Sequence, residues 1–261
     1  MCDSLDWHLR STCAIAVMAK ASILGETKTR LVPPLTENEA AELNTVFLRD
    51  AADNILSAAM FASIRGWVAF SPAGAESFFR TRLPKSIGLI ETVAPTLGEC
   101  LYHAAATLIR AGHGAVCLIN SDSPTLPVGY LVTAATALAA PGDRIVLGPA
   151  TDGGYYLIGM KRPHAGLFED IAWSTDQVFS QTLARAGPLG VSVVQLPTWY
   201  DVDNKDTLQL LVEEVLDGRP FREAGAAALA PWTRDYLATL ARDWGLRERI
   251  CAGRARSGLA G

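Results

Sequence analysis

The residue best placed for chemistry in this sequence is an aspartate that follows an apolar run. Residues 115–119 are all apolar, which is typical of a strand covered on both faces of a parallel sheet. Asp122 comes next and Pro124 stops the strand, so we expect Asp122 at the carboxyl end of a central strand. Ligands bind at this edge of open α/β sheets, which makes Asp122 a candidate metal ligand. The alternative is an aspartate that only caps the turn or the next helix.

A basic loop follows the first predicted strand. Residues 20–31 contain Lys20, Lys28 and Arg30, which can bind phosphate oxygens as point charges or as a planar fork. Gly25 in the same loop lets the backbone approach a ligand closely. The loop has neither the P-loop spacing nor the G-x-G-x-x-G pattern of dinucleotide-binding folds. Its place after a strand favours a phosphate site over a solvated basic loop.

Three further aspartates, Asp152, Asp201 and Asp203, fall in predicted loops after strands. Asp152 precedes Gly153 and Gly154, which form either a tight hairpin turn or part of a ligand-binding loop. The other two flank a single residue, so we expect one to face the site and the other to cap a helix. Taken singly, each of these aspartates is more often a helix cap than a metal ligand. Together with the aspartate of the central strand, opposite a basic loop, they suit a hard divalent cation that holds a diphosphate.

Composition narrows the class of protein. The 261 residues are 49% hydrophobic and 19% charged, which fits one α/β domain or two small ones. The formal net charge of −4 gives no reason to expect a nucleic-acid partner. We find no apolar run of the ~20 residues that a transmembrane helix needs, and no secretory signal. The five cysteines are scattered and odd in number, which predicts reduced thiols in a cytoplasmic protein.

The basic loop and the four aspartates must be positioned by strands that alternate with helices. We expect strands at 13–19, 67–70, 87–90, 115–119, 144–147, 155–158 and 191–194. Capping-box patterns predict helices that begin at Thr36, Thr96 and Ser174, and Asn204 or Asp203 can cap another. This alternation predicts an α/β fold with a mostly parallel sheet and right-handed crossovers.

The composition changes past Gly218. We therefore expect a main domain over residues 12–218 and a helical extension over residues 219–261. Leu237, Leu240, Ala241 and Trp244 lie at helical spacing within residues 233–250, so we expect a helix docked on the domain or on the second subunit of a homodimer. Residues 1–11 and the tail from Ala252 read as loose ends.

Several motifs in one order resemble a known family. They are residues 25–31 (GETKTRL), 121–124 (SDSP), 148–159 (GPATDGGYYLIG), 173–175 (WST) and 201–203 (DVD). The pattern, over about residues 13–212, resembles the DUF2064 family, also called the rSAM/selenodomain-associated transferase 1 family. That family is similar to GT-A-fold nucleotide-diphospho-sugar transferases and, more distantly, to guanylyltransferases. This chain departs from the family pattern at residues 21–24, where the family has Ala-Pro-x-Pro, and at residues 91–96.

The resemblance implies a GT-A-like α/β fold and a metal-dependent transferase acting on a nucleotide-activated donor, most simply a nucleotide-diphospho-sugar. It implies that Lys28 and Arg30 bind phosphate and that Asp122 replaces the D-x-D metal motif. Asp152 and Asp203 would be acidic residues of the active site, and Asp203 would also be a ligand of Mg²⁺ or Mn²⁺. A nucleotidyltransferase that releases pyrophosphate and a non-catalytic nucleotide-binding protein are the alternatives, and the base, sugar and acceptor stay open.

Overall fold

The computed structural model describes residues 9, 11–222 and 227–252, and within them seven strands form one sheet in the order β3-β2-β1-β4-β6-β5-β7. The strands are β1 (Cys13–Lys20), β2 (Ile64–Ser71), β3 (Gly88–Glu91), β4 (Ala115–Ile119), β5 (Arg144–Pro149), β6 (Tyr155–Met160) and β7 (Ser192–Gln195). Neighbours pair in parallel except at β6, which is antiparallel to both β4 and β5. The predicted mostly parallel sheet is confirmed, and Gly153 and Gly154 lie in the β5–β6 hairpin.

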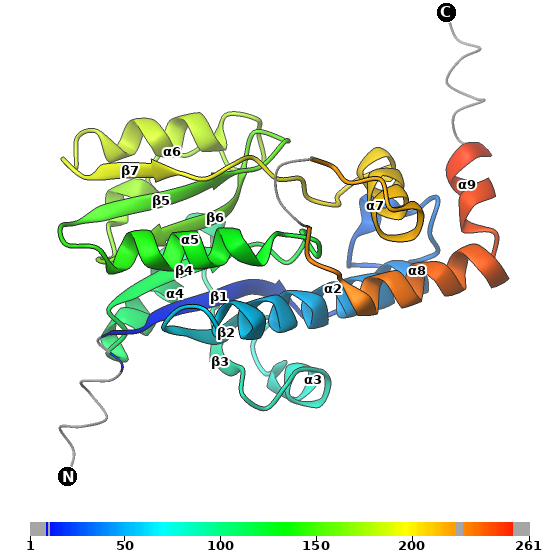
Figure 1. Ribbon diagram of the computed structural model, residues 1–261, viewed down its shortest axis with the longest axis horizontal. Coiled ribbons are helices and arrows are strands. Elements are labelled where there is room, and N and C mark those ends of the chain that lie inside the picture. Colours follow the sequence, from blue (N-terminus) through cyan, green and yellow to red (C-terminus); the bar gives the residue numbers. More distant parts are fainter. Residues whose placement is uncertain (1–8, 10, 223–226, 253–261) are drawn as a thin grey trace, which may run out of the picture.

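Helices cover both faces of the sheet (Figure 1). Along β1, Ile15 and Val17 point into one hydrophobic core, and Ala14 and Ala16 point into the other, as the two-residue period of a strand requires. The first core contains residues of α2 (Glu37–Ala58), α3 (Glu76–Arg82), α5 (Val128–Ala139) and α7 (Lys205–Asp217). The second contains residues of α4 (Leu97–Arg110), α6 (Val178–Ala186) and the 3₁₀ helix η2 (Ala165–Leu167).

Local capping signals place three helix starts as predicted. Thr36 and Glu39 form a reciprocal capping box at α2, and Thr96 and Glu99 form another at α4. At α7 the cap is Asn204, whose side-chain oxygen accepts hydrogen bonds from two backbone N–H groups of the first turn, each at 3.0 Å. The capping choice left open between Asn204 and Asp203 is thus settled in favour of Asn204.

The predicted helix start at Ser174 is wrong. Helix α6 begins at Val178, and its N-cap Gln177 makes no side-chain capping bond. The hydroxyl of Thr175 instead donates to Ala172 O at 2.7 Å, which keeps the chain in a turn. A tertiary contact takes the role of the cap, because Phe179 N donates to Gly153 O at 2.8 Å.

The C-terminal segment forms two helices, α8 (Pro231–Asp243) and α9 (Leu246–Ala252), where one was predicted. Gly245 adopts the left-handed conformation between them with φ of 61°, which ends the first helix. Trp244 is 66% exposed, whereas Leu237 and Leu240 are buried. The break therefore removes Trp244 from the predicted apolar stripe.

Helix α8 runs beside α2 (Figure 1), and a buried carboxylate joins them. Asp50 on α2 accepts hydrogen bonds from Trp232 N at 3.1 Å and Thr233 N at 2.8 Å, so it caps the N-terminus of α8. Burial raises the pKa of Asp50 to about 6. Arg249 on α9 forms a two-pronged ion pair with Glu39 at 2.7 and 3.0 Å. Polar contacts thus hold both C-terminal helices on α2.

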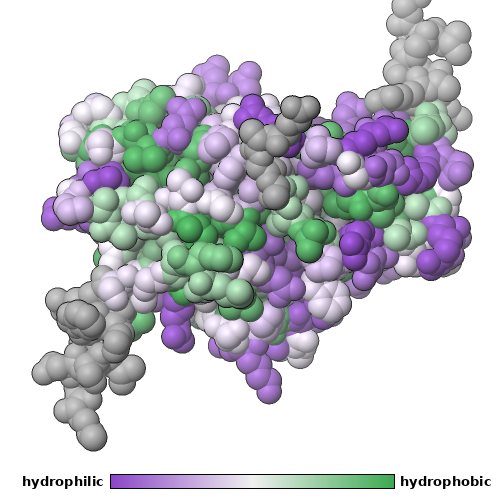
Figure 2. Space-filling model, viewed as in Figure 1, coloured by the Kyte–Doolittle hydropathy of each residue, from purple (hydrophilic) through white to green (hydrophobic). Residues whose placement is uncertain are grey.

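Hydrophilic and hydrophobic residues are intermixed over the face that carries α2, α5 and α8 (Figure 2). Within the described ranges, none of the helices is both long and apolar enough to cross a bilayer. Cys13, Cys100, Cys117 and Cys251 are free thiols. The predicted loose ends fall mainly on residues 1–8, 10 and 253–261, outside the described residues. The domain boundary, the homodimer and the cytoplasmic location stay predictions.

Candidate functional site

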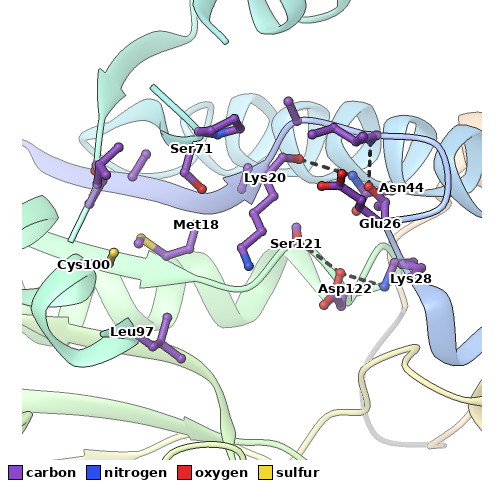
Figure 3. Close-up of a pocket in the computed structure, with 18 of the residues that line it drawn as sticks. Met18, Lys20, Glu26, Lys28, Asn44, Ser71, Leu97, Cys100, Ser121 and Asp122 are labelled. Atoms are coloured by element: carbon purple, nitrogen blue, oxygen red, sulfur yellow. Dashed lines mark hydrogen bonds and ion pairs between the residues drawn. The ribbon is translucent and has the colours of Figure 1, made fainter. Parts of the chain in front are cut away.

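A cavity of about 850 Å³ opens at the carboxyl ends of the parallel strands. Its walls come from the loop after β1, the end of β2, the loop between β3 and α4, and the loop after β4. The crossover connections of a parallel sheet leave their loops at this edge, which is why segments distant in sequence meet there. Figure 3 shows side chains from these loops pointing into the cavity.

Five of the predicted site residues line this cavity: Lys20, Lys28, Arg30, Asp122 and Asp203. The other predicted residues, Gly25, Asp152, Gly153 and Gly154, lie outside its lining. The structure therefore brings the basic loop and two of the four aspartates together in the cavity lining, while Asp152 of the β5–β6 hairpin lies outside the lining but near enough for its charge to act on Asp203.

The ammonium of Lys28 lies between carboxylates. Its Nζ is 2.8 Å from Asp122 Oδ1 and 3.7 Å from Asp203 Oδ1, and it donates to Val202 O at 2.9 Å. Ser121 Oγ donates to the same Asp122 Oδ1 at 3.0 Å, as Figure 3 shows. The Lys28 side chain is only 6% exposed. This side chain is thus a buried cation with protein partners.

Lys20 and Arg30 are the more available cations. The side chain of Lys20 extends into the cavity (Figure 3), and among the described residues no carboxylate forms an ion pair with it. The Arg30 side chain is 73% exposed, and its Nη1 is 3.9 Å from Asp203 Oδ2. Both groups can therefore reach the oxygens of a phosphate without giving up a close partner.

Four aspartates gather beside the cavity. Burial, together with the charges of Asp152 and Asp203, raises the pKa of Asp201 to about 7. Burial also raises the pKa of Asp203, the charge of Asp122 adds to this rise, and Lys28 opposes it. Asp203 faces the cavity, while Asp201 is buried beside the other acids and caps no helix. The acids repel one another, so a cation bound among them would be stabilised.

The loop from Asp152 to Gly154 is held mainly by its own contacts and by α6. Gly154 N donates to Asp152 Oδ1 at 2.8 Å, which closes a turn typical of aspartate. Gly153 has a left-handed φ of 91°, and a Cβ placed there would overlap the backbone carbonyl of Asp176. This glycine is therefore required both by conformation and by space.

Gly153→Ala should destabilise the protein by about 2–5 kcal/mol, the sum of left-handed strain and overpacking. The matched control is Gly74→Ala, because Gly74 also has a left-handed φ, of 78°, but nothing within 4 Å of an added Cβ. That variant should lose only about 1–2 kcal/mol. Urea unfolding of both variants measures the difference, and equal losses would show that the loop yields to the methyl group.

The acids fit a divalent metal ion that also binds a ligand. Among the described residues, no three acidic, histidine or cysteine side chains form a metal-binding group of their own. Mg²⁺, however, commonly takes only one or two carboxylates and completes its shell with waters and substrate phosphates. Asp122 and Asp203 already converge on one cationic centre, the ammonium of Lys28. Their donor set therefore suits a metal ion bound together with a diphosphate.

Sequence reasoning missed one wall of the cavity. The loop between β3 and α4 contributes residues 92–97, and Ser71, Cys100 and Ser121 also line the space. The sequence could have predicted this wall. Ser71 and residues 92–97 follow predicted strands, and the carboxyl ends of these strands lie at the same edge of the sheet. This wall includes the segment that departs from the family pattern.

A protein-family model matches the middle of the chain. Residues 54–175 match the family described as an uncharacterized protein conserved in bacteria, DUF2064. The resemblance to DUF2064 is confirmed. The DUF2064 match covers β2 to β6, the segment that contains Asp122 and Asp152. None of the curated proteins compared with the chain matches it.

Solved structures share the fold of this chain. A crystal structure of a candidate nucleotide-diphospho-sugar transferase from Desulfovibrio desulfuricans G20 is 25% identical, with a TM-score of 0.74 over 89% of this chain and 97% of that one. A CMP:2-keto-3-deoxy-manno-octonic acid synthetase, solved with CTP, is 11% identical, with a TM-score of 0.51 over 80% of this chain and 100% of that one. The predicted GT-A-like α/β fold is confirmed.

Proposed function

We propose that this protein is a metal-dependent transferase that acts on a nucleotide-activated donor, specifically a nucleotide-diphospho-sugar. The observation that carries the proposal is the cavity at the sheet edge, in which Lys20 and Arg30 face a pair of acids, Asp122 and Asp203. Similarity to the candidate nucleotide-diphospho-sugar transferase of D. desulfuricans over nearly the whole chain supports the choice of donor. The volume of about 850 Å³ has room for a nucleotide.

Each charged group has a role in this proposal. Lys20 and Arg30 bind the diphosphate oxygens from the side of the cavity that follows β1. Asp122 and Asp203 hold the divalent metal ion, which when bound neutralises charge on the diphosphate leaving group. Asp152 stays a proposed site acid that acts through the acid cluster, since it lies outside the cavity lining and its charge raises the pKa values of Asp201 and Asp203. Fixed charges aimed at the leaving group would lower the barrier to transfer.

A thermal-shift screen tests the proposal. Nucleotides and nucleotide sugars are added with Mn²⁺, with Mg²⁺ or with neither, at about a hundred times the dissociation constant. A ligand at this excess stabilises the native state by ~2.7 kcal/mol, which should raise the midpoint of unfolding by roughly 5–10 °C. The effect should require both the metal ion and the diphosphate, so the matching nucleoside without phosphates serves as the control.

Product analysis of the best ligand then decides the reaction. Sugar transfer releases a nucleoside diphosphate, whereas nucleotidyl transfer from a triphosphate releases pyrophosphate. Stabilisation by nucleotides without turnover of any donor would instead indicate a non-catalytic nucleotide-binding protein. The absence of a metal-dependent shift with every nucleotide would contradict the proposal as a whole.

A further inference from the structure

The ammonium of Lys28 already has partners of opposite charge. Its Nζ donates a hydrogen bond to Val202 O at 2.9 Å and forms an ion pair with Asp122 Oδ1 at 2.8 Å, while Asp203 Oδ1 lies beyond hydrogen-bonding distance at 3.7 Å. The ring of Phe47 lies beside the same ammonium, with its centroid 5.1 Å from Nζ. A ligand that approaches Lys28 therefore meets an ammonium whose charge two carboxylates already balance.

The backbone around Lys28 holds it in this place. Lys28 has a positive φ of 50°, a conformation that non-glycine residues adopt rarely and often at functional sites. It stands directly before the 3₁₀ helix η1 (Thr29–Leu31), where Leu31 N donates to Lys28 O at 2.9 Å and the Leu31 side chain is fully buried. The strained backbone thus turns the side chain inwards, toward the acids.

The carboxylates that balance the charge of Lys28 are the ones that a metal ion would need. Oδ1 of Asp122 and Oδ1 of Asp203 lie 2.8 and 3.7 Å from the ammonium, and its other partners among the described residues are the carbonyl of Val202 and the ring of Phe47. A divalent ion held by these two carboxylates would lie close to the ammonium, and the two positive charges would repel each other strongly. We propose that Lys28 is a resident counter-ion in the cation site of Asp122 and Asp203, and that it must release both carboxylates before a divalent metal ion binds.

This inference rests on the proposed function and adds how binding of the metal ion and binding of the diphosphate depend on each other. A metal ion alone must displace the ammonium and leave it without a carboxylate partner. When a diphosphate enters with the metal ion, the displaced ammonium gains a phosphate oxygen, because Lys28 lines the same cavity. Binding of the metal ion and binding of the diphosphate are therefore positively coupled through one side chain, and each raises the affinity for the other by the same factor.

The test measures Mn²⁺ binding by electron paramagnetic resonance in wild type and Lys28→Gln. Glutamine removes the charge but keeps an N–H donor for Val202 O. For Mn²⁺ alone, the variant should bind at least about tenfold more tightly, which corresponds to ~1.4 kcal/mol. With inorganic pyrophosphate present, the order of the two affinities should reverse. Wild type should then bind Mn²⁺ together with pyrophosphate more tightly than Lys28→Gln does, by a similar factor. A residue with a merely structural role would not give opposite signs in the two titrations.

Arg30→Gln is the matched control, because it removes one positive charge that lies 3.9 Å from Asp203 but is 73% exposed. Its affinity for Mn²⁺ alone should change by less than about threefold, since the exposed charge is screened by solvent. Circular dichroism and thermal unfolding establish that each variant is folded.

A measurement on wild type covers the case in which Lys28→Gln does not fold. Lys28 should be protected from acetylation by acetic anhydride in the free protein, and saturating Mn²⁺ should raise its modification rate severalfold as read by mass spectrometry. The exposed Lys85 is the internal reference. An unchanged rate at Lys28 would overturn the inference.

The outcomes separate this inference from the proposed function. If wild type binds Mn²⁺ with pyrophosphate while Lys28→Gln binds Mn²⁺ alone no better than wild type, Lys28 is not a competing counter-ion, and the proposed function stands. If wild type binds neither Mn²⁺ nor its pyrophosphate complex, the metal-dependent function fails, and this inference fails with it.

Discussion

Asp122→Asn is expected to reduce metal-dependent diphosphate binding by about a hundredfold or more while leaving the protein folded. Loss of a group that merely orients a metal ligand costs roughly 10–100-fold in affinity, so loss of a carboxylate ligand should reach the upper end. The amide oxygen of asparagine can still accept the hydrogen bond from Ser121 Oγ. The variant therefore keeps this hydrogen bond and loses the charge, and with it the ion pair with Lys28 at 2.8 Å.

Calorimetric titration of Mn²⁺ with pyrophosphate into wild type and Asp122→Asn measures this effect. Asp217→Asn is the control, because it removes a carboxylate that lies outside the cavity. Asp217, at the end of α7, pairs with Arg247 of α9 at 2.8 Å. It should bind as wild type does. If a folded Asp122→Asn protein also binds as wild type does, Asp122 only caps its turn, and the main support for metal-assisted transfer is removed.

Removal of the C-terminal helices should be the most destabilising change to the chain. Truncation after Gly218 exposes the core surface on which Leu237, Leu240, Leu246 and Ile250 are buried. At ~1.5–3 kcal/mol for each aliphatic side chain, the loss should exceed about 5 kcal/mol. It also leaves the fully buried Asp50 without the two N–H groups of α8. Since whole domains are stable by only ~5–15 kcal/mol, we expect a protein that is barely folded.

Urea unfolding of the truncated protein checks this expectation, and two point variants calibrate it. Leu237→Ala should cost ~2–5 kcal/mol because Leu237 is fully buried. Trp244→Ala should stay within about 0.5 kcal/mol, since Trp244 is 66% exposed. Truncation without loss of stability would show that the helices dock only weakly. A folded truncation that binds no nucleotide would show that they belong to the site.

The helix starts and the sheet edge were readable from the sequence because they depend on short-range patterns. Thr36 with Glu39 and Thr96 with Glu99 lie three residues apart, and each pair closes hydrogen bonds within its own first turn. The apolar run before Asp122 fixes a buried strand, and chain alternation makes that strand parallel to β1. Asp122, Lys20 and Arg30 could therefore be assigned to one edge of one sheet without any coordinates.

What those residues contact was decided only by the tertiary structure. Lys28 bonds to Val202 O across 174 residues of sequence, and no local pattern distinguishes an ammonium that meets two carboxylates from one left free for phosphate. The same holds for α6, whose cap is the carbonyl of Gly153, and for α8, whose cap is Asp50 on another helix. A propensity or capping signal describes bonds within a few residues. The partner of a buried charge is chosen by the way distant segments pack, because a charge taken out of water is stabilised by whichever opposite charge the fold brings within reach.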